Sequence, residues 1–328
     1  MVYLGLFAGF VILLLSGDFL VRGAIVLAMR LGVPSLIIGL TVVAFGTSAP
    51  ELVVSVRAIL SGSSGIALGN IVGSNIANIL LVLGLPALIC PTDCDQPLIK
   101  RNMFYVIAAS ILFIVLCFNG PLITWHGAIL FSLIVLFLIE SGRRMGSMSN
   151  SVTKDDTALE QIDGVAGLPN SAPALVMFLI IGILGLPIGA EVIVSNATEI
   201  ARAFDVSEAA IGLTLIALGT SLPELSTTFV AALRGHCGLA LGNVLGSNLF
   251  NILAVMGVTA MMAPVAIPET FLHYDLWVML AATLAITPFV MMRARITRIP
   301  ATLFICAYGI YVYFVFAPNF ATLTTAMH

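Results

Sequence analysis

Residues 38–52 read IGLTVVAFGTSAPEL, and residues 211–225 read IGLTLIALGTSLPEL. A second stretch, ALGNIVGSNIANIL at residues 67–80, returns as ALGNVLGSNLFNIL at residues 240–253. Both copies are offset by 173 residues, and an ungapped comparison spanning both stretches has 27 identities in 47 positions. Chance similarity between apolar segments cannot supply matched Thr, Ser, Glu and Asn residues, so the chain contains an internal duplication.

The composition of the duplicated chain is that of a membrane protein. Of its 328 residues, 60% are hydrophobic and only 9% are charged, whereas a soluble domain has about 25% charged residues. So few charges cannot cover a water-exposed surface, and lipid is therefore the expected solvent. The net charge of −3 and the lack of a basic tract give no support to a nucleic-acid partner.

A helix needs about 20 apolar residues to cross a bilayer. This criterion predicts ten spans, near residues 4–29, 36–60, 66–89, 103–118, 123–140, 174–199, 209–233, 239–263, 276–292 and 299–316. The first is expected to be retained rather than cleaved, because no positively charged segment precedes it.

One long polar stretch, 141–169, divides the spans into five and five. We therefore predict a first half at 1–140, a cytoplasmic linker at 141–173 and a second half at 174–328. Because five is odd, the second half must enter the membrane from the opposite side to the first. The predicted fold is an all-α integral membrane protein with ten transmembrane helices in two inverted five-helix repeats.

Loop charge gives an independent prediction of orientation. If the N-terminus is outside, ten Lys and Arg residues fall in inside loops, and only Arg57 and Arg202 fall in outside loops. The positive-inside rule then places both termini outside and the linker in the cytoplasm. We expect a multi-pass protein of the plasma membrane, which is the inner membrane in bacteria.

Two carboxylates, Glu51 and Glu224, lie inside apolar segments at equivalent positions of the duplication. A charge at the bilayer centre costs about 2.5–3.5 kcal/mol even on insertion scales, so such a residue needs a partner or a polar cavity. An ion pair with Arg57 is disfavoured, because Arg57 is six residues further on and Val230 replaces it in the second copy. A functional role for both carboxylates is therefore predicted.

Hydroxyl groups and a proline surround each Glu. Thr47 and Ser48 lie four and three residues before Glu51, on the same face of a helix. Pro50 has no N–H, so it leaves the carbonyl of Gly46 without its helical donor. Hydroxyl, carbonyl and carboxylate oxygens are the ligands that hard cations such as Na⁺ and Ca²⁺ prefer. The second copy repeats the arrangement with Thr220, Ser221, Pro223, Glu224 and Gly219.

The next span of each half has a polar stripe at every fourth residue, formed by Asn70, Ser74 and Asn78 and repeated as Asn243, Ser247 and Asn251. Ion contact is favoured for Ser74, Asn78, Ser247 and Asn251, since each brings an oxygen next to a Glu-bearing helix. For Asn70, Asn75, Asn243 and Asn248, hydrogen bonding between helices is an equally good interpretation. The duplicated glycines are expected to allow close helix packing rather than to bind an ion.

The other ionisable residues in the spans have simpler interpretations. Asp18 lies one turn before Arg22, which predicts a local ion pair. Glu191, the equivalent of Asp18, has no such partner and is left without a role. His126 and His273 lie near predicted span ends, where an interfacial position is favoured over proton relay.

At the duplicated GTSxPE and GNxxGSNxxN motifs, the sequence resembles the sodium/calcium exchanger superfamily of cation/calcium antiporters, and in particular its compact prokaryotic branch. The resemblance covers nearly the whole chain. It implies two alpha-repeats in which spans 2, 3, 7 and 8 enclose four cation positions. The implied ligands are Glu51, Thr47, Ser48, Ser74, Asn78, Glu224, Thr220, Ser221, Ser247 and Asn251, together with the carbonyls of Ala44 and Ala217.

The resemblance implies exchange of Na⁺ for Ca²⁺ by alternating access, with a part in intracellular calcium homeostasis. No cofactor is implied beyond the transported ions, and the protein is expected to act as a monomer and not as an enzyme. The alternatives are Ca²⁺/H⁺ antiport and K⁺-dependent Na⁺/Ca²⁺ antiport. The K⁺-dependent branch uses an Asp for K⁺, whereas Asn78 and Asn251 are neutral here. The H⁺-coupled branch has a different glutamate motif.

Two other classes of protein compete with an antiporter. An intramembrane hydrolase would need a base beside its nucleophile, and no His accompanies either motif. A passive channel would dissipate Ca²⁺ without any counter-ion gradient.

Overall fold

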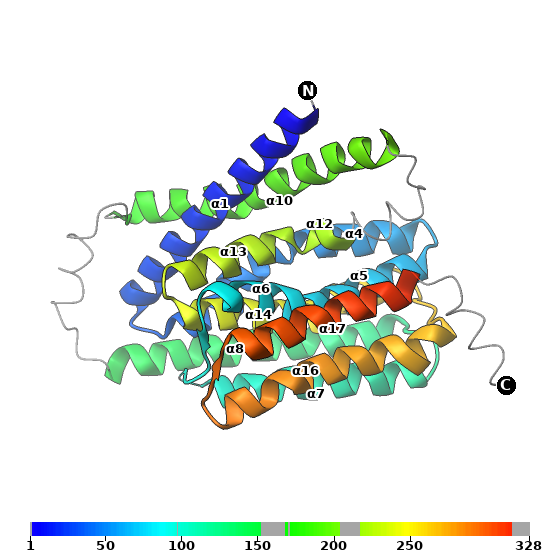
Figure 1. Ribbon diagram of the computed structural model, residues 1–328. Helices are drawn as coiled ribbons and strands as arrows, with labels where there is room; N and C mark the ends of the chain where they lie inside the picture. Colours follow the sequence, from blue (N-terminus) through cyan, green and yellow to red (C-terminus); the bar gives the residue numbers. More distant parts are fainter. Residues whose placement is uncertain (1, 97, 152–167, 170, 204–216, 317–328) are drawn as a thin grey trace.

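The computed structural model describes residues 2–96, 98–151, 168–169, 171–203 and 217–316 (Figure 1). Among these residues, eight helices are long and apolar enough to cross a membrane. The pair Ser35–Thr47 and Ala49–Leu60, bent by 43° at its junction, passes the same test as a ninth candidate span. The predicted span 209–233 lies partly outside the described residues, so the count of ten stays a prediction.

The first half agrees with the predicted spans to within a few residues at most ends. Its elements are α1 (Val2–Leu31), α2 (Ser35–Ile38), η1 (Gly39–Val43), α3 (Ala44–Thr47), α4 (Ala49–Leu60), α5 (Ser64–Ala77), η2 (Asn78–Val82), α6 (Gly84–Ile89), β1 (Thr92–Asp93), α7 (Ile99–Phe118) and α8 (Thr124–Ser151). The segments labelled η are π-helical.

The largest difference is at α8, which continues to Ser151. Residues 141–151, at the start of the predicted linker, are therefore helical, which their polar composition did not indicate. The Arg144 guanidinium donates to the carboxylate of Glu140 at 2.8 Å, and pairs four residues apart stabilise a helix that has left the apolar segment. Residues 152–167 of the predicted linker lie outside the described residues.

The described part of the second half follows the helix order of the first, but its strand precedes the last helix, whereas β1 precedes α7. Its elements are α10 (Ala172–Ala203), α12 (Ala217–Thr220), α13 (Leu222–Leu233), α14 (Cys237–Phe250), η4 (Asn251–Val255), α15 (Met256–Met262), η5 (Phe271–Asp275), α16 (Leu276–Met291), β2 (Arg295–Ile296) and α17 (Arg298–Phe316). The only departure from an all-α fold in named elements is the two-residue antiparallel pairing of β1 with β2.

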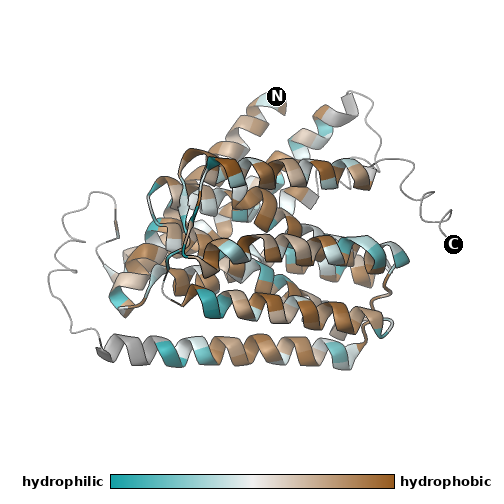
Figure 2. Ribbon diagram, turned by 60° about the horizontal axis from the view of Figure 1, so that its bottom comes forward, coloured by the Kyte–Doolittle hydropathy of each residue, from teal (hydrophilic) through white to brown (hydrophobic). Residues whose placement is uncertain are grey.

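The helices divide into a buried centre and a lipid-facing periphery. The continuous helices α5–α6 and α14–α15 have 78% and 83% of their most apolar segments buried, whereas the values for α1 and α10 are 33% and 28%. Figure 1 shows α1 and α10 crossing along one side of the molecule. Figure 2 shows hydrophobic residues along most helices, with hydrophilic ones concentrated towards their ends. This distribution is the one expected for helices that cross a bilayer.

Glycines bring the two peripheral helices together. A Cβ atom at Gly182 would lie 2.5 Å from the Cβ of Leu20, and one at Gly189 would lie 2.7 Å from the backbone nitrogen of Leu13. Contact at this distance between helices in lipid depends on residues without side chains. These are not the duplicated glycines for which close packing was predicted. Among those, a Cβ atom at Gly39 would lie 2.6 Å from the carbonyl oxygen of Leu239, which confirms the prediction there, whereas one at Gly73 would have no described atom within 4 Å.

The same tight turn places α5 beside α4 and α14 beside α13. Gly62 and Gly235 are equivalent residues, with φ of +79° and +75°. In each turn the next residue donates its N–H to a carbonyl five residues earlier, at 2.9 Å. Positive φ favours glycine, so both copies return directly from the Glu-bearing helix into the helix with the asparagine stripe.

Two loop contacts are related by the duplication. Thr92 pairs with Ile296 in the β1–β2 ladder, and Leu122 forms an antiparallel bridge with Val265. Val265 is the equivalent of Thr92 at the offset of 173 residues, and position 296 is the equivalent of 123, next to Leu122. Each contact therefore joins one loop from each half, and the loop that the first half supplies to one contact is the equivalent of the loop that the second half supplies to the other.

An ion-pair cluster joins α1 to the end of α13. The predicted pair of Asp18 with Arg22 is confirmed at 2.7 Å. Arg234 also contacts Asp18, and its Nε donates to the carboxylate at 2.6 Å. The pattern of near neighbours did not indicate this contact, because the two residues are 216 positions apart.

The Arg234→Gln variant is expected to lose about 1 kcal/mol of stability or less, since partly exposed ion pairs contribute about 0.2–1 kcal/mol. The measurement is the melting temperature of the purified protein in detergent. Arg57→Gln is the control, because Arg57 is exposed and no described acidic side chain pairs with it. Equal melting temperatures for the two variants would show that the Asp18–Arg234 contact has no effect on stability.

Candidate cation site

Both predicted carboxylates are completely buried, and each lies in the first turn of a helix that follows a break. Glu51 and Glu224 have 0% exposure. The breaks occur at Ser48 (φ −84°, ψ 5°) and Ser221 (φ −88°, ψ 1°), and α4 and α13 have a proline within their first two residues. Proline is favoured there because its N–H would have no helical partner. The predicted kinks are confirmed, but Thr47 and Glu51 belong to two helical segments rather than one regular helix.

Hydroxyl groups from one half contact polar groups of the other at this break. Ser48 donates to a carboxylate oxygen of Glu224 at 3.3 Å. The hydroxyls of Thr47 and Ser247 are 3.3 Å apart, and Ser221 donates to the hydroxyl of Ser74 at 3.3 Å. The duplicated motifs therefore converge on one buried site.

Several buried oxygens at this site have no hydrogen-bond partner among the described residues. They are both carboxylate oxygens of Glu51, Oε2 of Glu224 and the Oδ1 atoms of Asn75, Asn78 and Asn251. A buried polar atom without a partner costs about 1–3 kcal/mol. A bound Na⁺ or Ca²⁺ would satisfy these acceptors, since both ions prefer carboxylate and carbonyl oxygens. The alternative ion pair of Glu51 with Arg57 is wrong, because Arg57 is exposed.

Asn78 and Asn251 each begin a π-helical segment, η2 and η4. Such segments are rare and frequently mark functional sites. The amide nitrogen of Asn78 donates to Oδ1 of Asn248 at 3.0 Å, and Asn248 donates to the backbone oxygen of Asn75 at 3.2 Å. Because the amide nitrogen of Asn78 faces Asn248, Oδ1 of Asn78 points away from Asn248. Asn251 is fully buried with both side-chain polar atoms unpartnered among the described residues.

The two alanines of the predicted set, Ala44 and Ala217, each lie four residues before the serine at a helix break. The carbonyl of Ala44 accepts the N–H of Ser48 at 3.0 Å and the hydroxyl of Thr47 at 3.3 Å. It therefore lies directly at the helix break. Ala217 is the first residue of α12, which places it three residues before Thr220.

Asn70 and Asn243 make matching hydrogen bonds to the Glu-bearing helix of their own half. Asn70 donates to the hydroxyl of Ser55 at 2.9 Å and to the backbone oxygen of Glu51 at 3.2 Å. Asn243 makes the equivalent bonds to Thr228 at 3.0 Å and to Glu224 at 3.3 Å. The sequence favoured hydrogen bonding between helices and ion contact equally for Asn70 and Asn243. The observed bonds are hydrogen bonds between helices.

The remaining ionisable candidates lie away from the site. Glu191 is exposed on α10. His126 lies in the first turn of α8, where its Nδ1 accepts the N–H of Ile123 at 3.2 Å. His273 lies in η5, at the start of the span Phe271–Met291. Their predicted positions near span ends are confirmed.

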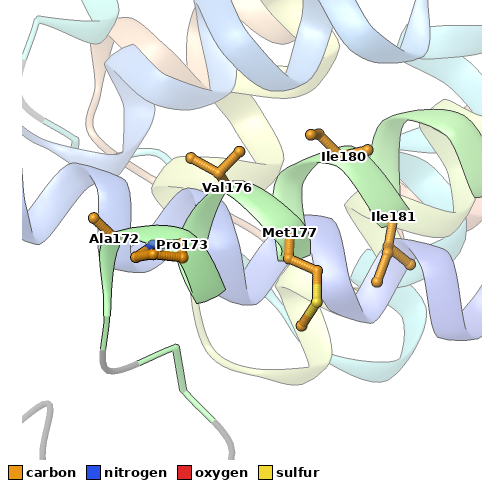
Figure 3. Close-up of a pocket in the computed structure, with 6 residues that line it drawn as sticks. All are labelled: Ala172, Pro173, Val176, Met177, Ile180 and Ile181. Atoms are coloured by element: carbon orange, nitrogen blue, oxygen red, sulfur yellow. The ribbon is translucent and has the colours of Figure 1, made fainter.

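A surface recess on α10 is unrelated to the carboxylates. It is lined by Ala172, Pro173, Val176, Met177, Ile180 and Ile181. Figure 3 shows hydrocarbon and thioether side chains there and none that could coordinate a hard cation. This surface is suited to lipid contact, which agrees with the peripheral position of α10.

The fold and the site define a multi-pass membrane protein in which two repeated halves share one buried cluster of carboxylate, hydroxyl and amide groups. Residues 1–141 and 174–317 match the family model of the sodium/calcium exchanger protein. The chain therefore belongs to the sodium/calcium exchanger family. Because this family consists of exchangers, the protein is classed with transporters rather than enzymes.

Relatives from bacteria and archaea align with most of the chain. Inner membrane protein YrbG of Escherichia coli (strain K12) is 37% identical over 85% of both chains. Sodium/calcium exchanger MaX1 of Methanosarcina acetivorans is 31% identical over 90% of this chain and 93% of its own length. Among solved structures, the sodium-calcium exchanger NCX_Mj superposes with a TM-score of 0.80 and 33% identity, covering 95% of this chain and 98% of that chain.

Proposed function

We propose that this protein is an antiporter that exchanges Na⁺ for Ca²⁺ through the site between Glu51 and Glu224. The observation that carries the proposal is the set of unpartnered buried oxygens contributed by both halves. The names of two similar proteins, sodium/calcium exchanger MaX1 and the sodium-calcium exchanger NCX_Mj, support the choice of ions. Na⁺ and Ca²⁺ are then the substrates, and no further cofactor is part of the proposal.

The proposed ligands are the two carboxylates and the neutral oxygens that surround them. They are Glu51, Glu224, Thr47, Thr220, Ser48, Ser221, Ser74, Ser247, Asn78 and Asn251, with the backbone carbonyls of Ala44 and Ala217. The hydrogen bonds among the hydroxyl groups support this set, since they bring oxygens from four helices to one place.

Charge explains why the two ions would exclude each other. Two ionised carboxylates give the site a charge of about −2, which one Ca²⁺ or two Na⁺ neutralise. Two unit charges about 4 Å apart interact by about 4 kcal/mol at an effective dielectric constant of about 20. Repulsion between the cations therefore strongly disfavours a site that holds one Ca²⁺ and two Na⁺ at the same time. Competition for the same two carboxylates is therefore the proposed physical basis of antiport.

We further propose ten spans in two inverted repeats, with halves at 1–140 and 174–328, a cytoplasmic connection between them and both termini outside. The paired turns at Gly62 and Gly235 and the paired loop contacts support the inversion. The repeats would move against each other around a fixed site, as a monomer in the plasma membrane. An inner membrane protein among the relatives supports this location.

The proposal is tested with purified protein in liposomes, by measuring uptake of radioactive Ca²⁺. Vesicles loaded with Na⁺ and diluted into Na⁺-free buffer are expected to accumulate Ca²⁺, and vesicles without the Na⁺ gradient are not. A Na⁺ ionophore should abolish the uptake. Uptake driven by a pH gradient alone would indicate H⁺ coupling instead. A strict requirement for K⁺ would indicate the K⁺-dependent type, and uptake without any gradient would indicate a channel.

A further inference from the structure

We infer that Asn70 and Asn243 are positioning residues for cation binding. Each holds the hydroxyl group of a threonine from the opposite half so that the lone pairs of that hydroxyl face the cation. The inference deepens the proposed function, because it concerns the same site. It assigns a role to two residues outside the proposed ligand set.

The first observation is that the orientation of the Asn70 amide is determined by its surroundings. Its nitrogen donates to two oxygens of its own half, the Ser55 hydroxyl at 2.9 Å and the Glu51 carbonyl at 3.2 Å. The nitrogen must therefore face α4, and Oδ1 must face away from it. That oxygen accepts the hydroxyl of Thr220, from the other half, at 3.2 Å.

The second observation is that Asn243 repeats this arrangement with the halves exchanged. Its nitrogen donates to Thr228 at 3.0 Å and to the carbonyl of Glu224 at 3.3 Å. Its Oδ1 accepts the hydroxyl of Thr47 at 3.3 Å. The nitrogen also donates to Thr227 at 2.9 Å, a bond without a counterpart because position 54 is Val. The other partners are equivalent to those of Asn70 at the offset of 173 residues, and in both copies Oδ1 faces a threonine of the opposite half.

The chemistry of a hydroxyl ligand explains the need for an acceptor. A threonine hydroxyl has one proton and two lone pairs, and a cation must be met by a lone pair while the proton points elsewhere. Thr47 is fully buried and Thr220 is 6% exposed, so bulk water is not available to accept that proton. For Thr47 the Ala44 carbonyl, itself a proposed ligand, is another acceptor at 3.3 Å, and a proton directed to Asn243 leaves that carbonyl available to the cation. Asn70 and Asn243, with 7% and 1% exposure, supply a fixed acceptor at this depth.

The test is a pair of double-mutant cycles on Ca²⁺ binding to the purified protein in detergent, measured with radioactive Ca²⁺. Asn70→Ala and Thr220→Val are each expected to weaken binding about tenfold, the size of one hydrogen bond of about 1.4 kcal/mol. The double variant is expected to bind no more weakly than Thr220→Val alone, because the hydroxyl that Asn70 orients is already absent. Coupled residues show such non-additivity.

The crossed combination is the matched control. Asn70→Ala with Thr47→Val is expected to weaken binding about a hundredfold, because separate contacts add in free energy. Thr220→Ser retains the hydroxyl, so Asn70→Ala should again cost about tenfold in that background. Ser110→Ala removes a buried hydroxyl on α7 that donates to its own helix, at Val106, at 2.8 Å, and is expected to change Ca²⁺ affinity less than about twofold.

Multiplicative losses in the matched pair, or unchanged affinity in a folded Asn70→Ala variant, would overturn the inference. If Asn70→Ala does not yield monodisperse protein, the cycle of Asn243→Ala with Thr47→Val decides the question by the same criteria. Because binding is measured without a Na⁺ gradient, the outcome is separate from the exchange activity. A wild-type protein that binds Ca²⁺ but does not exchange it would contradict only the proposed function.

Discussion

Replacing either buried carboxylate by its amide, in Glu51→Gln or Glu224→Gln, is expected to abolish Na⁺-driven Ca²⁺ uptake into liposomes. Each substitution keeps the size of the side chain and removes one of the two negative charges. A Ca²⁺ ion in a fully buried site would then retain an uncompensated positive charge, and leaving a buried charge without its partner costs about 3–5 kcal/mol. This corresponds to a loss of at least about a hundredfold in Ca²⁺ affinity.

The matched control for these variants is Glu191→Gln. Glu191 is also an acidic residue within an apolar helix, but it is exposed on α10 rather than buried between the two halves. Uptake by this variant is expected to stay within about twofold of the wild type, since exposed substitutions away from special features have small effects. Normal exchange by Glu51→Gln or Glu224→Gln protein would remove the basis for placing the cation between these residues.

The second large effect is expected at Gly242, where α14 touches the backbone of the other half. A Cβ atom at this position would overlap the carbonyl oxygen of Leu36 and lie 3.0 Å from the Cα of Gly39. At Gly246, one turn later, it would lie 2.6 Å from the Cβ of Ala44. The contacted atoms at Gly242 are backbone atoms, which cannot change rotamer, so α14 would have to separate from α2 and η1.

Gly242→Val is therefore expected to prevent accumulation of folded protein. Overpacking costs about 1–3 kcal/mol and sometimes more, and rigid neighbours place this site at the upper end. The measurement is the yield of monodisperse protein after detergent extraction, together with its melting temperature. The control is Gly309→Val on α17, which is exposed and has no described atom within 4 Å of the added Cβ. A Gly242→Val protein with wild-type yield and stability would show that the two helices can separate without loss.

Features that depend on near neighbours along the chain could be predicted from the sequence. Pro50 and Pro223 indicated breaks beside the two carboxylates, because a proline removes a helical donor whatever surrounds it. The spacing of Asp18 and Arg22 indicated their ion pair, since residues four apart face each other on any helix. The duplication indicated that two equivalent polar motifs exist.

Features that depend on how helices pack were not accessible in this way. The contact of Ser48 with Glu224 joins residues 176 positions apart, and helical periodicity does not encode which helix a given face meets. The same applies to the contact of Arg234 with Asp18. The length of α8 was underestimated because polarity marks where a helix leaves the membrane, not where it ends.

The amino-acid sequence by itself determined that this protein crosses a membrane, that it is built from two equivalent halves and that hydroxyl, amide and carboxylate oxygens accompany its two buried acidic residues. These properties follow from hydropathy, repetition and local spacing. Only the tertiary structure decided which oxygen meets which partner, and that Asn70 and Asn243 reach the threonines of the opposite half. The orientation of an amide is set by every group around it, and those groups come together only when the two halves are packed against each other.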